Sequence, residues 1–249
     1  EFDISEDFYE VLERALYYYH LTNGVFDPTI NPLIDLWGFS KDGYLEEIPS
    51  QDMIDSTLVL IGMNKLQMKS GSKIEKNKPV EIDLSAIAKG YGVDKIAEYL
   101  KKINLHNYMV EIGGEIRTSG KNKENNDWII GLQNPNSRHN DPILRLSLVD
   151  MSLATSGNYR NYYKVNGKRY SHIISPLTGY PINNDILSVS VISPKCIDAD
   201  AFATSLMLLD VKEGLELINK IDKAEAIYIL RDSSIVQSDF FNKYYFSYN

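Results

Sequence analysis

The sequence predicts an α+β fold with mixed, largely antiparallel sheets and packed helices. Helical and extended segments alternate along the 249 residues without the regular strand–helix–strand rhythm of a parallel sheet. An Asn-Gly pair at 166–167, within residues 159–174, indicates a tight hairpin. No repeat or low-complexity stretch interrupts this pattern, so we expect one architecture throughout.

Three helices are predicted in the first half of the chain. The stretch SEDFYEVLERALYYYHLTNG has apolar residues at helical spacing, with Ser5 as the candidate N-cap and Asn23-Gly24 as the stop. Ser50 is the candidate cap of a second helix. A third helix is expected in residues 85–103. Its later turns are expected to bury four residues, namely Ile96, Tyr99, Leu100 and Ile103.

The rest of the chain reads mainly as strands, with helices at 198–210 and 212–221. Two extended runs flank Gly113-Gly114, and the hairpin lies within residues 159–174. The other strands are expected within residues 127–133, 143–150, 186–192, 224–231 and 244–248.

Charge and composition exclude several classes of protein. Lys and Arg total 26 against 34 Asp and Glu, so the net charge of -8 offers no electrostatic footprint for nucleic acid or an anionic membrane. Cys196 is the only cysteine, which excludes an internal disulfide and a Cys-rich metal cluster. No apolar run approaches the roughly 20 residues of a membrane span. The chain begins at Glu1 without a methionine or a signal-like segment, which leaves room for a leader, an anchor or a further N-terminal region.

The stretch DADAFAT, residues 198–204, is the first candidate for chemistry. Asp200 and Thr204 stand four apart, so on a helix their oxygens lie on one face, where they can ligate a hard cation such as Mg²⁺. Alternatively, Asp198 or Asp200 caps the helix and Thr204 bonds back to a carbonyl. The spacing alone favours the cap.

A second candidate is EIDLSAIAKGYGVDK, residues 81–95, with Asp83, Lys89 and two glycines around a change from strand to helix. Glycines let a backbone approach a ligand, and a helix N-terminus with a lysine favours phosphate. Neither a Walker loop nor a Rossmann fingerprint is present. By itself the stretch reads better as a capped helix with Lys89 exposed.

Three further stretches are less specific. Residues 24–40 form an apolar loop whose Phe26 and Trp37 either face a planar ligand or make a satellite core. His172 has no Gly-x-Ser-x-Gly elbow to accompany it, so a structural histidine is favoured over a triad member. Residues 155–158 suggest a tight polar turn.

Taken in order, seven stretches resemble the ApbE family of flavin transferases over nearly the whole chain. Each stretch is only moderately specific, but seven in the right order are very specific. They are GVFDPTINPLIDLWGFS, IDLSAIAKGYGVDKIAEYL, VEIGGEIRTSG, WIIGLQNP, ATSGNYRNYY, YSHIISPLTGYPI and DADAFATSLMLL.

The resemblance implies a single ApbE-like catalytic domain over residues 1–249, two-lobed and similar to the T-fold. It implies Mg²⁺-dependent cleavage of FAD, with FMN passed to a threonine hydroxyl of a partner protein and AMP released. The family's metal site matches Asp200 and Thr204 through their side chains and Ala86 through its backbone oxygen. The neighbouring stretches thus reverse the weighting that spacing alone gave to DADAFAT.

The resemblance also implies the residues that contact the flavin substrate and the candidates for the base. Gly113-Gly114 matches the family's double glycine, which we interpret as a close backbone approach. The incoming threonine needs a base, for which Asp200 and His172 are the two candidates. The positions that match the family's flavin site are Phe26, Asp27, Asp83, Lys89 and Ile174.

Family analogy places the protein outside the cytoplasmic membrane, often anchored by a lipid, with a membrane redox-complex subunit or an extracytoplasmic flavoprotein as acceptor. Family members usually begin with a further segment that contributes a first strand and flavin contacts. The chain is expected to lack it, either as a fragment or because that part is missing and FAD binding is weaker. Two other functions stay open: an FAD pyrophosphatase that releases FMN and AMP, and a flavin-binding module without turnover.

Overall fold

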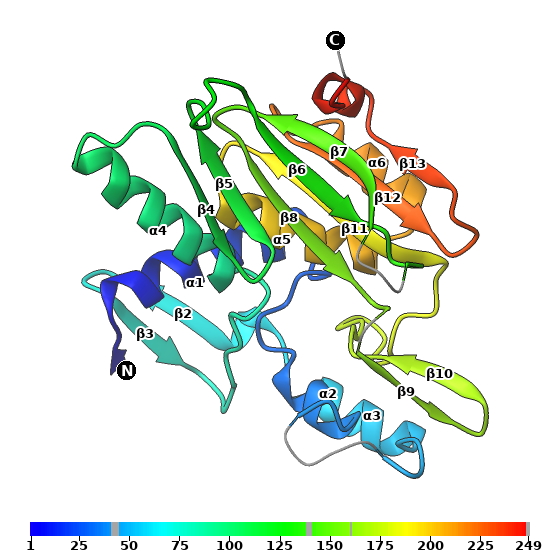
Figure 1. Cartoon of the computed structure of the whole chain (residues 1–249). Coiled ribbons are helices and arrows are strands. Elements are labelled where there is room, and N and C mark those ends of the chain that lie inside the picture. Colours follow the sequence, from blue (N-terminus) through cyan, green and yellow to red (C-terminus); the bar gives the residue numbers. More distant parts are fainter. Residues whose placement is uncertain (41–44, 138–140, 160, 248–249) are drawn as a thin grey trace. The chain divides into compact units, whose positions relative to one another are not determined.

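The computed structural model describes residues 1–40, 45–137, 141–159 and 161–247. The chain divides into two compact units (Figure 1), of which the first comprises residues 1–86 and 160–184 and the second residues 87–159 and 185–249. Each unit combines helices with antiparallel strands. The predicted α+β class with largely antiparallel sheets is therefore confirmed.

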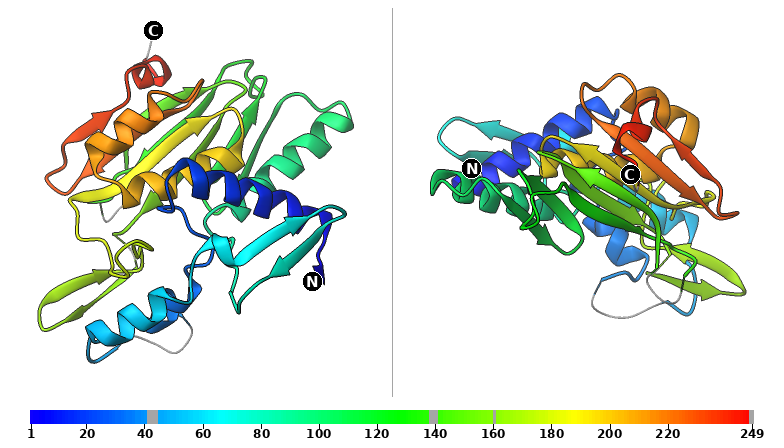
Figure 2. Two further views of the ribbon diagram at one scale, coloured as in Figure 1. Left: turned by 180° about the vertical axis from the view of Figure 1, so that it is seen from behind. Right: turned by 45° about the horizontal axis from the view of Figure 1, so that its top comes forward.

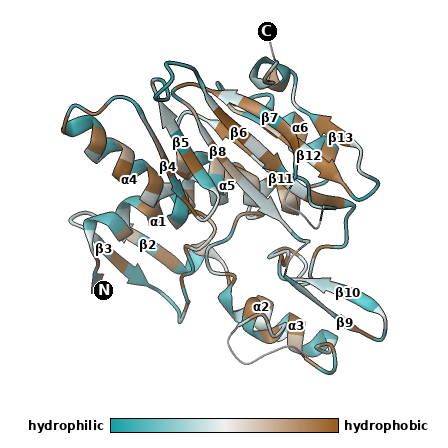
Figure 3. Cartoon of the chain, viewed as in Figure 1, coloured by the Kyte–Doolittle hydropathy of each residue, from teal (hydrophilic) through white to brown (hydrophobic). Residues whose placement is uncertain are grey.

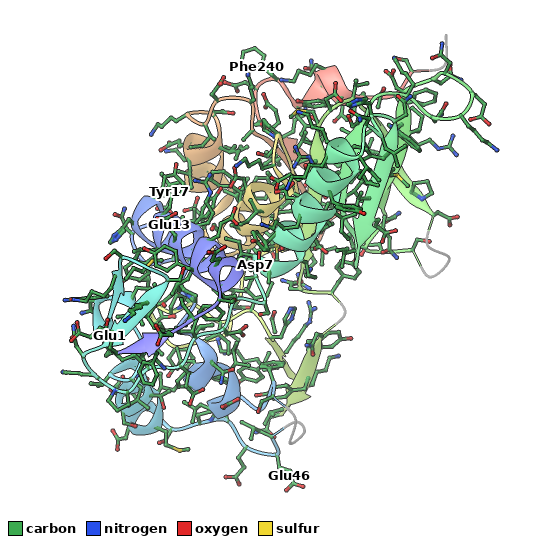
Figure 4. All side chains as sticks on the ribbon, turned by 90° about the vertical axis from the view of Figure 1, so that its left-hand side faces the viewer. Glu1, Asp7, Glu13, Tyr17, Glu46 and Phe240 are labelled. Carbon is green, nitrogen blue, oxygen red and sulfur yellow. The ribbon has the colours of Figure 1, made fainter. Side chains whose placement is uncertain are left out.

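The first unit opens with a small sheet and a long helix. Strands β1 (Phe2–Asp3), β3 (Lys73–Lys76) and β2 (Leu66–Lys69) pair in that order, and the 3₁₀ helix η1 (Met63–Lys65) precedes β2. Helix α1 (Glu6–Leu21) begins where predicted, because the Ser5 hydroxyl accepts a hydrogen bond from the Phe8 amide at 3.1 Å. It buries Leu12 against the sheet, while Glu13 and Tyr17 project from its outer face (Figure 4).

The rest of the first unit holds two short helices and a hairpin. They are α2 (Asn31–Leu36), α3 (Gln51–Leu58), β9 (Tyr162–Val165) and β10 (Lys168–Ser171). Ser50 caps α3, and the hairpin turns at Asn166 and Gly167, whose φ angles of 49° and 78° suit a tight hairpin turn. Both predictions are confirmed.

Residues 24–40 are not a plain loop, because they contain α2. Trp37, at the end of α2, is fully buried and lies 5.5 Å from the Tyr170 ring in a stacked arrangement. Its Nε1 donates a hydrogen bond to the Gly179 carbonyl at 2.7 Å. Of the two expectations for Trp37, the structure supports the satellite core.

The second unit is built on a six-stranded antiparallel sheet of order β13-β12-β11-β8-β5-β4. Hairpin β6–β7 packs on one face of the sheet, and helices α5 and α6 cover the other (Figures 1 and 2). The strands are β4 (Tyr108–Ile112), β5 (Glu115–Ser119), β6 (Trp128–Gln133), β7 (Pro142–Leu148), β8 (Ser152–Gly157), β11 (Ile186–Ser193), β12 (Glu225–Leu230) and β13 (Ile235–Gln237). The helices are α4 (Ala88–Lys102), α5 (Cys196–Leu208), α6 (Val211–Ile218) and the 3₁₀ helix η2 (Phe241–Tyr244).

Helix α5 and strand β11 form the centre of this unit. All eight residues of β11 are buried because both faces of the sheet are covered. Helix α5 is buried almost all round, which is typical of a helix inside a core. Asp200 lies on this helix, and a buried carboxylate is costly unless hydrogen bonds, an opposite charge or a metal ion compensate for the loss of water.

The predicted buried face of α4 was wrong. Ile96, Tyr99 and Ile103 are 44%, 61% and 48% exposed, and hydrophobic residues are visible along the outside of the helix (Figure 3). The face that packs on α5 instead carries small or polar residues, which bring the two helices closer than large side chains would allow. These buried residues are Gly90, Val93, Asp94 and Ala97, with Leu100 half-buried beside them.

Two further local predictions were also wrong. Residues 155–157 do not form a turn but are the end of β8. The strand expected at 244–248 does not form among the described residues. The 3₁₀ helix η2, which contains the fully buried Phe241, extends to Tyr244, and Tyr245 makes only an isolated bridge. Tyr248 lies outside the described residues. The last strand is the three-residue β13, too short to be found by its pattern. No helix in the part of the chain that the structure describes is long and apolar enough to span a membrane.

Candidate functional site

Helices α4 and α5 meet backbone to backbone at Gly90. A Cβ atom placed there would lie 2.3 Å from the Cys196 carbonyl oxygen and 2.8 Å from the Ile197 Cα. Neither atom belongs to a flexible side chain, so only glycine fits at this position. Gly90, one of the two glycines expected to admit a ligand, therefore serves the packing of the helices.

The two helices also cap one another. Asp94 of α4 accepts hydrogen bonds from the amides of Cys196 and Ile197, both at 3.0 Å, at the first turn of α5. Asp200 of α5 in turn caps α4, since its Oδ2 accepts a hydrogen bond at 2.9 Å from the amide of Gly90 in the first turn of α4. Each carboxylate satisfies amides that a helix N-terminus leaves unpaired, and each is favoured by the positive end of the helix dipole.

The expectation that Asp198 or Asp200 caps its own helix was therefore wrong. Helix α5 begins at Cys196, two residues before Asp198, and the side chain of its N-cap residue, Lys195, makes no capping hydrogen bond. The Asp94 carboxylate supplies that cap from the neighbouring helix. Arg117 fixes this carboxylate, because its Nη1 donates to Oδ1 of Asp94 at 2.6 Å. Sequence spacing within one segment cannot reveal a cap that comes from another helix.

We predict that Asp94→Asn lowers the free energy of unfolding by about 2–4 kcal/mol, because a buried ion pair loses one partner and the α5 cap is weakened. Urea unfolding at neutral pH measures the change. Glu216→Gln, which removes the exposed i,i+4 pair with Lys212, is the control and is expected to cost under about 0.5 kcal/mol. Equal stability of the two variants would contradict the capping role.

Asp200 and Thr204 lie one turn apart on α5, as predicted. Asp200 is 3% exposed, and burial is the main cause that raises its pKa to about 6. The hydrogen bond from Gly90 and the charge of Lys89 lower this pKa, and the charge of Glu115 raises it. The Thr204 hydroxyl lies 3.2 Å from that of Ser156 on β8. Within the described residues Oδ1 of Asp200 accepts no hydrogen bond, so one carboxylate oxygen is left for another ligand.

This donor set fits Mg²⁺. A carboxylate and a hydroxyl are hard oxygen ligands, and Mg²⁺ keeps waters or substrate phosphates in its remaining positions. In the described part of the chain no group of three or more His, Cys, Asp or Glu residues could hold a metal, so a cage of acids or a zinc-type site is absent there. Ala86, whose backbone oxygen is the third predicted ligand, lies in the turn before α4 and belongs to the first unit.

Lys89, in the first turn of α4, is paired with a residue that the sequence did not suggest. Its Nζ lies 2.5 Å from Oε1 of Glu115, and the two side chains are 46% and 2% exposed. Glu115 begins β5 directly after the turn at Gly113 and Gly114, whose φ angles of 63° and 104° require glycine. In the sequence, the signal that could have identified Glu115 is a charged residue at an inward-facing position of a predicted strand.

Phe26 and Asp27 lie in the first unit, directly after α1. Phe26 is 3% exposed, and its amide donates to the Thr22 hydroxyl at 2.9 Å. Oδ1 of Asp27 accepts from the amide and the hydroxyl of Thr29, at 2.8 Å and 2.6 Å, so its orientation is fixed. Burial raises the pKa of Asp27, while the hydrogen bonds from Thr29 and the charge of Lys65 lower it.

Asp83 joins this stretch through the backbone. Its amide donates to the Pro28 carbonyl at 2.7 Å, and its carboxylate accepts from the Ser85 amide at 2.8 Å. The structure thus brings together two segments predicted to contact the flavin. A shallow pocket of about 280 Å³ in the same unit is lined by Val59, Asn64, Lys65, Asn77 and Lys78 and includes none of the predicted site residues.

His172 and Ile174 lie in the segment that follows β10. Nδ1 of His172 is 3.0 Å from the Asn161 carbonyl, which only accepts, so Nδ1 carries the proton and Nε2 has the lone pair. Burial, with a smaller effect from the charge of Arg169, lowers the pKa of His172. Ile174 is 4% exposed and forms an isolated bridge with Pro181.

Comparison with known proteins identifies the family of the chain. Residues 1–228 match the profile described as "ApbE family". The chain is 38% identical over 239 residues to an FAD:protein FMN transferase of Haemophilus influenzae, covering 94% of this chain and 69% of that protein. It is 39% identical over 215 residues to the FAD:protein FMN transferase of Vibrio cholerae, covering 86% and 64%. The chain thus spans roughly two thirds of the length of these two relatives.

Solved structures show the same relationship. The flavin transferase ApbE from Vibrio cholerae matches with a TM-score of 0.86 and 35% identity, over 98% of this chain and 78% of that one. The ApbE protein from Thermotoga maritima matches with a TM-score of 0.88 and 30% identity, over 98% and 80%. The chain belongs to the ApbE family of flavin transferases.

Proposed function

We propose that the protein cleaves FAD in a Mg²⁺-dependent reaction and attaches FMN through a phosphoester bond to a threonine of an acceptor protein, releasing AMP. The observation that carries the proposal is the buried Asp200 carboxylate, one turn from Thr204 and hydrogen-bonded to the first turn of the helix that carries Lys89. The names of the relatives supply the substrate, FAD, and the kind of acceptor, a protein.

The pyrophosphate of FAD is anionic, and a chain of net charge -8 must bind it with local positive charge. Lys89 supplies a half-exposed ammonium at the N-terminal end of α4. Asp200 and Thr204 would hold the Mg²⁺, with the Ala86 backbone oxygen as the ligand that the family resemblance adds. When bound, the ion would neutralise phosphate charge as the phosphorus–oxygen bond breaks.

The chemical step exchanges the phosphoanhydride oxygen on the FMN phosphorus for a phosphoester oxygen. The threonine oxygen of the acceptor forms a bond to the FMN phosphorus, the bond from that phosphorus to the AMP oxygen breaks, and AMP leaves with the electron pair. The threonine proton goes to a base. We favour His172 over Asp200 for this role. Burial lowers the pKa of His172 and so favours the neutral imidazole, with a lone pair on Nε2, whereas the oxygens of Asp200 have the Gly90 amide and the proposed ion as partners.

We predict that the protein, incubated with FAD, Mg²⁺ and an acceptor domain, yields acceptor-bound flavin fluorescence and an equal amount of AMP. An acceptor with its target threonine replaced by alanine is the control and should stay unlabelled. AMP released without any acceptor would instead identify an FAD pyrophosphatase. Intact FAD recovered from the protein after incubation with Mg²⁺ would identify a flavin-binding module. Because the chain spans about two thirds of its relatives, the full-length protein is assayed beside it.

We propose in addition that the full-length protein acts outside the cytoplasmic membrane, anchored through its N-terminus, on a membrane redox-complex subunit or an extracytoplasmic flavoprotein. The family resemblance supports this location. Fractionation of cells that express the full-length protein tests it, and recovery of the protein in the cytoplasmic fraction would contradict it.

A further inference from the structure

Glu115 is a buried acid whose surroundings balance its charge only in part. Its side chain is 2% exposed, and Oε1 is paired with the Lys89 ammonium at 2.5 Å. Within the described residues Oε2, also buried, has no hydrogen-bond partner. Burying an acidic side chain is costly unless it is paired, and Lys89 is the partner that the structure gives Glu115.

Lys89 in turn is constrained by Glu115. A lysine side chain at a surface samples many rotamers, and holding it in one costs entropy that a strong partner must offset. An ammonium has three N–H donors, of which Glu115 uses one. Because the Lys89 side chain is 46% exposed while Glu115 is buried, the other donors are available on the solvent side.

The turn before β5 packs against this pair and leaves room beside it. A Cβ atom at Gly113 would lie 3.5 Å from Oε2 of Glu115 and 3.6 Å from Cδ of Lys89, so a larger residue there would extend over the pair. On the other side, Lys89 is next in sequence to Gly90, whose amide binds the Asp200 carboxylate. The backbone of Lys89 therefore lies next to the Asp200 site.

We infer that Glu115 is a positioning residue: it anchors the Lys89 ammonium so that its remaining N–H donors bind an anionic phosphate oxygen of the substrate. The inference rests on the proposed function for the identity of the substrate, but the anchoring itself does not. Glu115 acts through Lys89 and does not touch the substrate.

Anchoring is measured first without FAD, by trace acetylation of the lysines with acetic anhydride and mass spectrometry. In Glu115→Gln, which keeps the size of the side chain, Lys89 should react several-fold faster than in the parent, with Lys95 unchanged. The matched control is Glu225→Gln, because Glu225 is likewise buried and its Oε1 lies 3.6 Å from Nζ of Lys243 in the same unit. It should leave Lys89 unchanged. Unaltered Lys89 reactivity in Glu115→Gln would overturn the inference.

Substrate binding is measured second. Glu115→Gln and Lys89→Ala should each raise the Kd of FAD by about tenfold, and the double variant should raise it no further, because the two residues act as one unit. The double variant leaves no unpaired buried charge, so it tests the coupling even if one single variant folds poorly. Additive effects would overturn the inference. A parent protein that binds no FAD would refute the proposed function and leave the acetylation result intact.

Discussion

Asp200→Asn is expected to abolish Mg²⁺ binding and to slow flavin transfer by at least about a thousandfold, a loss of roughly 4 kcal/mol of transition-state stabilisation. The reason is that the variant removes the one charged ligand proposed for the ion. Asparagine can still accept the hydrogen bond from the Gly90 amide, so the contact between the helices survives. Calorimetric titration with Mg²⁺ and the AMP-release assay measure the two effects.

The same substitution should stabilise the metal-free protein at alkaline pH. Burial raises the pKa of Asp200 from 3.8 to about 6. Between these values the folded state binds more protons than the unfolded state, so this group destabilises the fold as the pH rises through that window, by up to about 3 kcal/mol above pH 6. In chelator at pH 8 the asparagine variant should therefore unfold at higher urea than the parent, and near pH 4 the advantage should vanish.

Asp198→Asn is the control for Asp200→Asn, because it removes a half-buried carboxylate from the same helix. We expect it to keep Mg²⁺ binding and transfer activity. Two results would refute the assignment: full Mg²⁺ affinity in Asp200→Asn, or an equal loss in both variants.

Gly90→Ala is expected to lower the free energy of unfolding by more than about 3 kcal/mol. The new Cβ would lie 2.3 Å from the oxygen and 2.7 Å from the carbonyl carbon of Cys196, so α4 and α5 must separate. Separation also stretches the hydrogen bonds of Asp94 and Asp200 that join the helices. Urea unfolding, together with Mg²⁺ affinity of the folded fraction, measures both consequences.

Gly92→Ala is the matched control on the same helix. A Cβ there would lie 3.3 Å from Cδ1 of Ile112, the flexible end of a side chain that can move aside. In a helix interior alanine is also more favourable than glycine by up to about 1 kcal/mol, so the stability of this variant should be equal to or slightly above that of the parent. If Gly90→Ala were as stable as Gly92→Ala, the close approach of the helices would be wrong.

The sequence predicted helix caps and tight turns correctly where residues close in sequence determine them. The caps at Ser5 and Ser50 and the turn at Asn166-Gly167 each depend on residues close in sequence, and each is confirmed. The strands on either side of Gly113-Gly114 form as expected. In these cases the chemistry of a few neighbouring residues outweighs tertiary context.

Long-range contacts explain what could not be predicted. The buried face of α4 could not be found from hydrophobicity, because a glycine and an aspartate occupy it in order to fit and cap α5. The cap of α5 comes from Asp94, 102 residues from Cys196, and the partner of Lys89 is Glu115, 26 residues away. Spacing did place Asp200 and Thr204 on one face, but only the fold shows that Asp200 is buried and hydrogen-bonded to Gly90.

The Mg²⁺ site is tested by locating a divalent ion in crystals grown or soaked with Mn²⁺, which has an anomalous signal and prefers the same oxygen ligands as Mg²⁺. We expect an anomalous peak within about 2.5 Å of both Oδ1 of Asp200 and Oγ1 of Thr204, and the loss of this peak in Asp200→Asn. A peak elsewhere in a protein that transfers flavin, or a peak that persists in Asp200→Asn, would show that Asp200 and Thr204 do not hold the ion.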